Sequence, residues 1–241
     1  MALHPSGNIL GFYLEYCNGE SLRHLYEEIF AREEYFFECE TPNPLILDCG
    51  ANIGVATMFF KWLYPESTVV AFEADPTTFQ VLQHNINRNQ LRNVSAHNVA
   101  LWDRDERISF FVDDCHQGSP LMSAKPNRTL GREIKVEARR LSQYINMPVD
   151  LLKVDLEGSE DRVISELLQS GKLGLVRQMI LEYHHHVPGE APGLGNFLAI
   201  LEQSGWNYQL HSWFSPPAAR DVFQDIMIYA YRQPLAAESG R

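Results

Sequence analysis

Acidic and small residues follow a short apolar run at residues 45–47. The run ends at Asp48. Three residues that could shape a binding turn follow at alternate positions: Gly50, Asn52 and Gly54. An apolar run this short is typical of a central strand covered on both faces, and glycines let the following turn pass closely beneath a ligand. Apolar residues then recur at helical spacing. Strand, turn and helix together predict a site for a small ligand.

A second carboxylate closes the next apolar run. Residues 68–72 form that run, and Glu73 follows it directly. A carboxylate at this point of a strand-turn-helix unit can accept hydrogen bonds from both hydroxyl groups of a ribose. We therefore assign Glu73 and the adjacent Ala74 to the binding of a nucleoside cofactor.

The spacing of the first turn discriminates between two such cofactors. In the dinucleotide fingerprint, three glycines place a pyrophosphate at the helix N-terminus, and the turn after Asp48 departs from that spacing. An acidic residue here would repel a pyrophosphate but can hold the ammonium group of a methionyl chain. S-adenosylmethionine therefore fits better than NAD, with Asp48, Gly50, Asn52 and Gly54 at its methionyl end. A structural turn without a cofactor is the alternative.

Length, charge and cysteine placement limit the classes of function. The 241 residues suffice for one α/β domain with a small extension. The formal net charge of −11 argues against a nucleic-acid backbone or an anionic membrane as the main partner. The four cysteines form no CxxC pair, the N-terminus lacks a basic segment followed by an apolar core, and no apolar run reaches about 18 residues. We expect a cytoplasmic protein without a membrane span.

Two later segments are expected at the same edge of the sheet. Residues 94–101 predict a third strand, whose final Ala100 and Leu101 would lie beside the adenine. In residues 150–157, charged side chains alternate with apolar ones along a predicted strand. Because ligands of open α/β sheets bind beyond the carboxyl ends of the strands, Asp155 is expected beside the sulfonium.

His184 is the predicted general base. It lies in the polar run after the predicted strand 176–181, and an unperturbed histidine has a pKa near working pH. Glu182 or Asp155 would orient it or take its place, and His185 is assigned to the substrate. A polar loop without a role in catalysis is the alternative for these histidines.

The segment 113–131 is the longest without hydrophobic periodicity. Loops of this length in a compact domain are usually functional or mobile. We interpret it as a substrate-side loop, with Ser119 assigned to the substrate. A disordered insertion is the alternative.

A divalent metal is an alternative means of activating the acceptor. Four side chains could supply ligands and lower the pKa of a bound alcohol: Asp155, Glu157, Glu182 and His184. The chain contains no compact ligand motif such as HExxH. We therefore assign no metal ligands from the sequence.

Five motifs in a fixed order resemble those of the FkbM-type S-adenosylmethionine-dependent methyltransferases. They span roughly residues 35–186 and are Asp48-Cys-Gly-Ala-Asn-Ile-Gly, Ala71-Phe-Glu-Ala-Asp-Pro, Asn98-Val-Ala-Leu-Trp-Asp, Leu152-Lys-Val-Asp-Leu-Glu-Gly-Ser-Glu and Ile180-Leu-Glu-Tyr-His. The resemblance implies a class I methyltransferase fold, which is Rossmann-like: a seven-stranded, mostly parallel, doubly wound sheet with a C-terminal antiparallel hairpin. It also implies methyl transfer to a hydroxyl oxygen of a sugar, a polyketide-type compound or another natural-product intermediate.

The same reasoning predicts the organisation of the chain. Residues 1–40 form a strand and helix extension, packed on the sheet edge or closing over the cofactor as a lid; residues 41–233 form the methyltransferase domain, and 234–241 a tail. The acceptor would be a small molecule, free or carrier-bound. An NAD(P)-dependent oxidoreductase and a non-catalytic S-adenosylmethionine-binding module are the competing functions.

Overall fold

Short apolar runs form the central strands of the main sheet, as their lengths predict. The computed structural model describes residues 5–113, 122–125, 131–212 and 222–232. β3 (Leu45–Cys49) lies between β4 (Thr68–Phe72) and β9 (Val149–Val154), and the three strands are parallel. Their carboxyl ends therefore meet at one edge of the sheet.

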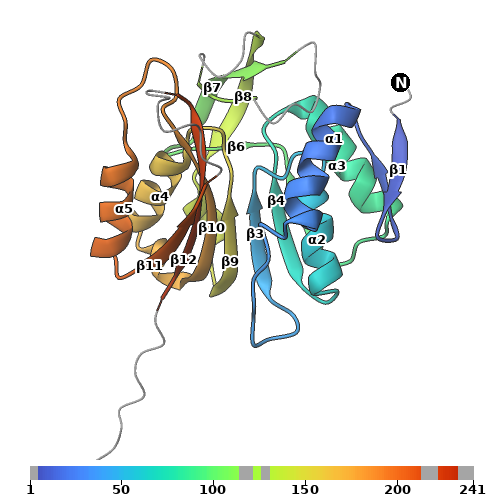
Figure 1. Cartoon of the computed structure of the whole chain (residues 1–241), viewed down its shortest axis with the longest axis horizontal. Helices are drawn as coiled ribbons and strands as arrows, with labels where there is room; N and C mark the ends of the chain where they lie inside the picture. Colours follow the sequence, from blue (N-terminus) through green and yellow to red (C-terminus); the bar gives the residue numbers. More distant parts are fainter. Residues whose placement is uncertain (1–4, 114–121, 126–130, 213–221, 233–241) are drawn as a thin grey trace, which may run out of the picture.

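Four more strands complete this sheet in the order β11-β12-β10-β9-β3-β4-β5 (Figure 1). β5 (Val94–His97) and β10 (Val176–His185) run parallel to their inner neighbours. β12 (Gln224–Tyr231) pairs antiparallel with both β10 and β11 (Asn207–His211). The predicted α/β fold with a mostly parallel central sheet is confirmed.

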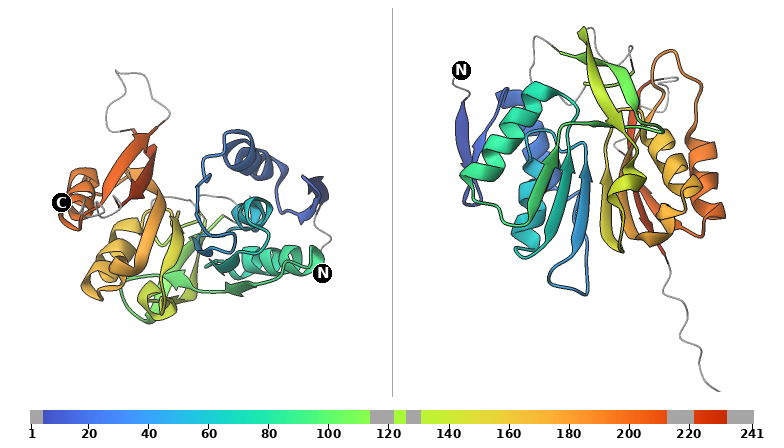
Figure 2. Two further views of the ribbon diagram at one scale, coloured as in Figure 1. Left: turned by 90° about the horizontal axis from the view of Figure 1, so that it is seen from below. Right: turned by 180° about the vertical axis from the view of Figure 1, so that it is seen from behind.

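Helices cover both faces of the sheet (Figures 1 and 2). α2 (Val55–Leu63) and α3 (Pro76–Arg88) pack on one face, and α4 (Glu160–Gln169) and α5 (Leu194–Gln203) pack on the other. The 3-10 turns η2 (Leu141–Tyr144) and η3 (Lys172–Leu175) connect elements on the α4 side. Among the described residues, no helix has both the length and the apolar character needed to cross a bilayer.

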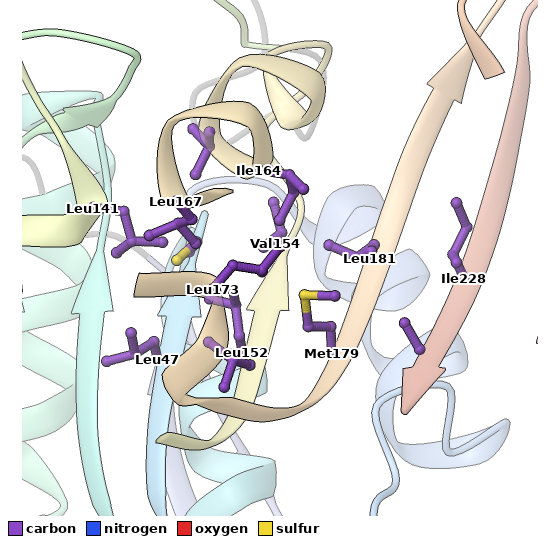
Figure 3. Packing of buried hydrophobic residues seen from close by; sticks show 14 of the residues in the cluster. Leu47, Leu141, Leu152, Val154, Ile164, Leu167, Leu173, Met179, Leu181 and Ile228 are labelled. Carbon is purple, nitrogen blue, oxygen red and sulfur yellow. The ribbon is translucent and has the colours of Figure 1, made fainter. Parts of the chain in front are cut away.

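The two faces of the sheet have separate cores because successive strand residues point to opposite sides. In β9, Leu151 belongs to the core beneath α2, whereas Leu152 and Val154 belong to the core beneath α4. Figure 3 shows Leu152 and Val154 in the same cluster as Leu167 of α4. These side chains are 0% exposed, so both faces of β9 are fully covered.

The N-terminal segment begins with a hairpin, not with the single strand predicted for the extension over residues 1–40. β1 (Ser6–Ile9) pairs antiparallel with β2 (Phe12–Glu15), and the two residues between them, Leu10 and Gly11, both have positive φ. Positive φ at both central residues is the conformation of a type I′ hairpin turn. α1 (Gly19–Tyr26) and a π-helical turn (Glu27–Ala31) then pack on the α2 side of the sheet.

The predicted third strand over 94–101 is divided between two sheets. β5 ends at His97, and Asn98 Nδ2 then donates hydrogen bonds to the carbonyl oxygens of Glu73, at 2.9 Å, and Ala74, at 3.1 Å. These bonds hold the chain at the end of β4. β6 (Ala100–Leu101) consequently joins a small sheet with β8 (Arg132–Arg139) and β7 (Glu106–Val112).

The turns after β3 and β9 touch each other. The amide of Asp155 donates to the Cys49 carbonyl at 3.1 Å, and Gly50 follows with φ of 84°. A Cβ at Gly50 would lie 1.8 Å from the carbonyl oxygen of Asp155. Glycine is therefore required at position 50 both by the backbone conformation and by the contact.

Gly50→Ala should destabilise the protein more than the same substitution at a glycine that has positive φ but open space around it. Gly171 is the matched control, because its φ is 73° and a Cβ added there would meet nothing within 4 Å beyond its chain neighbours. We expect Gly171→Ala to cost about 1–2 kcal/mol of unfolding free energy and Gly50→Ala about 1–3 kcal/mol more. Urea denaturation of both variants measures the difference, and equal losses would contradict the contact.

Candidate active site

A cavity opens where the carboxyl ends of β3, β4 and β9 meet. Its empty volume, which includes the open space at its mouth, is about 830 Å³. The loops after the three strands, the small sheet and the N-terminal segment all contribute to its wall. Its lining residues are Leu25, Ile29, Tyr35, Gly50, Ala51, Asn52, Val55, Ala56, Phe72, Glu73, Ala74, Val99, Ala100, Leu101, Phe110, Met122, Ala124, Lys153, Asp155, Leu156, Glu157 and Ser159.

Seven of the residues assigned to the cofactor line this one cavity: Gly50, Asn52, Glu73, Ala74, Ala100, Leu101 and Asp155. Gly54 does not line it. Gly54 instead caps the N-terminus of α2 with φ of 96°, and a Cβ there would lie 2.8 Å from Leu82 Cδ1. Its place is therefore explained by the packing of α2 against α3.

Glu73 is held rigidly at the cavity wall. Its Oε2 accepts the Asn52 amide at 2.9 Å, and its Oε1 accepts the Asp75 amide at 2.8 Å. Burial raises the pKa of Glu73 to about 7, although these hydrogen bonds act in the opposite direction. Each carboxylate oxygen has a second lone pair, so the ionised side chain can still accept a hydrogen bond from a ligand in the cavity.

The small sheet supplies an apolar wall. Ala100 belongs to β6 and Phe110 to β7, and both pack in one cluster with Met122. A flat, weakly polar group such as an aromatic base would lose little solvation here. Leu101 lines the same wall but packs into the core beneath α4.

Asp48 is buried outside the cavity. It therefore does not make the contact with an ammonium group that was predicted for it. Its side chain is 0% exposed and does not line the cavity. Oδ2 accepts a hydrogen bond from Thr57 Oγ1 at 2.6 Å, and Oδ1 lies 3.5 Å from Lys153 Nζ. Even-numbered residues of β3 point away from the α4 side, so the carboxylate is directed beneath α2.

Lys153 connects the turn after β3 to the turn after β9. Its buried ammonium donates to the Gly50 carbonyl at 2.7 Å and to Asp155 Oδ2 at 3.3 Å. Burial alone would lower the pKa of Lys153, but the carboxylates of Asp155 and Asp48 outweigh it and hold the pKa above its ordinary value. The ammonium therefore remains charged and balances two carboxylates.

Asp155 faces the cavity as predicted and is connected to Glu182 through Tyr35. The Tyr35 hydroxyl lies 3.3 Å from Asp155 Oδ2 and 3.2 Å from Glu182 Oε2. Burial, followed by the charge of Asp155, raises the pKa of Glu182 well above its usual range. A protonated Glu182 can donate to the Tyr35 oxygen while Tyr35 donates to Asp155. Glu182 does not line the cavity, so it reaches Asp155 only through this chain.

His184 does not have the property for which it was assigned as the base. Burial lowers its pKa, but the ion pair and hydrogen bond between Nδ1 and Glu160 Oε1, at 2.8 Å, outweigh burial and raise the pKa to about 9. At neutral pH the imidazole is therefore already protonated and cannot accept a proton. It is 5% exposed and does not line the cavity.

The two residues assigned to the substrate are not brought to the cavity. His185 lines a separate hollow together with Tyr183, His184 and His186. Ser119 lies outside the described residues. The lining residues that the sequence interpretation missed include three from the N-terminal segment, namely Leu25, Ile29 and Tyr35. No motif marked them, and only the helical spacing of Leu25 and Ile29 indicated a buried face.

The family model of the methyltransferase FkbM domain matches residues 48–210. Among relatives, the 31-O-demethyl-FK506 methyltransferase FkbM of Streptomyces tacrolimicus is 28% identical over 229 residues, covering 81% of this chain and 86% of that protein.

Solved structures share the fold. A methyltransferase FkbM from Methylobacillus flagellatus KT has a TM-score of 0.55 at 16% identity, over 86% of this chain and 48% of its own, so the chain spans about half of that structure. TYW2 of M. jannaschii, solved in complex with AdoMet, has a TM-score of 0.53 at 12% identity, over 97% and 88% of the two chains. The segment matched by the family model contains the cavity loops after β3, β4 and β9 and more than half of the sequence. The resemblance found in the motifs is thereby confirmed, and the chain belongs to the FkbM family of methyltransferases.

Proposed function

We propose that this protein transfers the methyl group of S-adenosylmethionine to a hydroxyl oxygen of a small molecule. The observation that carries the proposal is the arrangement of the cavity, in which Glu73 and Asp155 lie on loops at either side of the turn after β3. One carboxylate is placed for a ribose and the other for the end at which the sulfonium reacts. Membership of a methyltransferase family supports the same assignment.

The cofactor would lie across the carboxyl ends of the strands. Its ribose would donate hydrogen bonds to Glu73, and its adenine would pack against the apolar wall formed by Ala100 and Phe110. The turn containing Gly50 and Asn52 would pass beneath the methionyl chain. In this placement the cofactor lies against backbone and glycine positions. Close approach of a ligand or of Asp155 explains why glycine stands there.

The reaction needs an aligned oxygen and an acceptor for one proton. In the proposed step the acceptor oxygen forms a bond to the methyl carbon, the carbon–sulfur bond breaks, and the sulfonium becomes a neutral thioether. The hydroxyl proton passes to a carboxylate. We assign this role to Asp155, which faces the cavity, since His184 is held as a cation by Glu160.

The acceptor is proposed to be a sugar, a polyketide-type compound or another hydroxylated natural-product intermediate, free or carrier-bound. The name of the Streptomyces relative, a 31-O-demethyl-FK506 methyltransferase, describes methylation of an oxygen. The carboxylates of Asp155 and Glu157 at the cavity wall disfavour an anionic acceptor, because like charges repel in a partly buried site.

S-adenosylhomocysteine should stabilise the protein against heat, and NADH should not. A ligand that binds only the folded state stabilises it by about 2.7 kcal/mol at one hundred times its Kd. Thermal-shift titration with both compounds measures this difference. Selective stabilisation by NADH would contradict the proposal and favour an oxidoreductase.

Glu73→Gln should weaken S-adenosylhomocysteine binding by about 10–100-fold, which corresponds to about 1.5–3 kcal/mol for hydrogen bonds to a charged group. In the wild-type protein the affinity should also depend on pH. Because the pKa of Glu73 is raised to about 7, the accepting carboxylate is lost as the pH falls through that value. We expect binding about tenfold weaker at pH 6 than at pH 8.

Calorimetric titration across this pH range checks both effects. Glu73→Gln should lose the pH dependence, whereas Glu133→Gln, an exposed position on β8, should keep both affinity and pH profile. An unchanged Kd in Glu73→Gln would remove the ribose assignment.

Asp155→Asn should lower kcat by about 10²–10⁴-fold, the range for a general base, and leave the Kd for S-adenosylhomocysteine within about threefold because the thioether is neutral. Turnover is followed as S-adenosylhomocysteine release, with the acceptor that reacts fastest in a panel of sugars and macrolides. Asp103→Asn, which removes a surface partner of Arg162, is the control. Full turnover in Asp155→Asn would exclude Asp155 as the proton acceptor.

A further inference from the structure

Ligand-type atoms from two strands and from the loop after β9 converge beside the cavity. Nε2 of His184, on β10, lies 3.2 Å from Glu157 Oε2 and 4.0 Å from Asp155 Oδ1, both in the loop after β9. Asp225 Oδ1, on β12, lies 3.8 Å from the same nitrogen. The ligand atoms of Asp155, Glu157 and His184 all lie within 4.8 Å of one another.

These separations match the spacing of ligands around one ion. Two ligands that each lie about 2.1 Å from an octahedral cation are about 3.0 Å apart when adjacent and about 4.2 Å apart when opposite. The three distances from Nε2, namely 3.2, 3.8 and 4.0 Å, fall between these limits. An ion could therefore be accommodated with small movements of side chains alone.

His184 is oriented as a metal-binding histidine is. Its side chain is 1% exposed and directs Nε2 toward the cluster, while Nδ1 donates to Glu160 Oε1 at 2.8 Å. Glu160 is itself fixed by the amides of Leu156, at 3.1 Å, and Gly158, at 2.9 Å. Metal-binding histidines almost always donate their second nitrogen to such a partner, which sets the ring orientation.

The cluster is also in the right place for the acceptor. Asp155 and Glu157 line the cavity, and His184 lies behind them. Two carboxylates and one imidazole on adjacent strands leave the cavity side of an ion open to other ligands. A hydroxyl oxygen of an acceptor could occupy such an open position.

We propose that Asp155, Glu157 and His184 bind a divalent cation. Oxygen ligands with one imidazole suit Mn²⁺ or Mg²⁺. Because a ligating imidazole nitrogen carries no proton, the ion would displace the Nε2 proton of His184, while Nδ1 would keep its hydrogen bond to Glu160. The ion would hold the acceptor hydroxyl and lower its pKa, so this role rests on the proposed function. Binding of the ion does not depend on that function and can be measured by itself.

The test is titration of the full chain, dialysed against EDTA, with Mn²⁺, followed by water-proton relaxation. One Mn²⁺ per chain is expected. His184→Ala and Glu157→Gln should each raise the Kd at least tenfold, and Glu160→Gln should raise it about 10–100-fold, as loss of an outer partner of a metal-binding histidine does. His84→Ala, which removes a half-exposed histidine paired with Glu15, should leave the Kd unchanged.

Three outcomes would overturn the site. The first is that no Mn²⁺ binds to the chain. The second is that His184→Ala and Glu157→Gln leave the Kd for Mn²⁺ unchanged. The third is that His84→Ala raises this Kd as much as they do. Because His184→Ala removes a buried ring, the conservative Glu157→Gln and Glu160→Gln variants keep the test decisive if that variant does not fold. Circular dichroism melting identifies the folded variants.

A second measurement separates this inference from the proposed function. S-adenosylhomocysteine binding should persist in EDTA, whereas methyl transfer should fall and return on addition of Mn²⁺. Transfer at full rate in EDTA, with no Mn²⁺ bound, would overturn the role of the ion in the reaction and leave the methyltransferase proposal standing. One bound Mn²⁺ without any S-adenosylhomocysteine binding would support the site and contradict the proposed function.

Discussion

The buried ammonium of Lys153 is the interaction on which the arrangement of the cavity depends. It joins the Gly50 carbonyl after β3 to Asp155 after β9 and lies close to Asp48. Unpaired buried carboxylates are costly, and the removal of one partner of a buried pair costs several kcal/mol. With Lys153 in place, the two strand ends can approach so closely that only glycine fits at position 50.

The cavity has two chemically different ends because two sheets meet there. The small sheet contributes an apolar wall, whereas the loops after β9 and β10 carry the charged groups. A sulfonium would be attracted to the anionic end, and the neutral thioether left after transfer would lose that attraction. The charge distribution therefore favours the reacting form of the proposed cofactor over its product.

The N-terminal segment takes part in the site through Tyr35. Its ring lies beneath the Lys153 ammonium, 5.2 Å from Nζ to the ring centroid, and its hydroxyl connects Asp155 with Glu182. A residue far from β9 and β10 in the sequence thus fixes the relative position of two carboxylates. Leu25 and Ile29 line the same side of the cavity, so changes in this segment can alter both acceptor selection and proton transfer.

The local sequence pattern was sufficient to predict the central strands of the main sheet and part of the site. Short apolar runs between polar turns predicted β3 and β4, since a strand covered on both faces needs an apolar residue at nearly every position. Charged side chains alternating with apolar ones predicted β9. Because the carboxyl ends of parallel strands share one edge, the motifs also predicted that Glu73, Ala100 and Asp155 would line one cavity. The family follows from the order and spacing of the same motifs.

Only the tertiary structure decided which polar groups face a ligand and which balance one another. Asp48 is directed beneath α2 and paired with Lys153, and His184 is held as a cation by Glu160. A side chain's direction and its pKa depend on neighbours that come from other strands, and residue type does not encode them. The convergence of Asp155, Glu157 and His184 is likewise a product of strand order. The sequence by itself therefore determined the scaffold and the family, whereas contacts between distant segments determined the chemistry of the cavity.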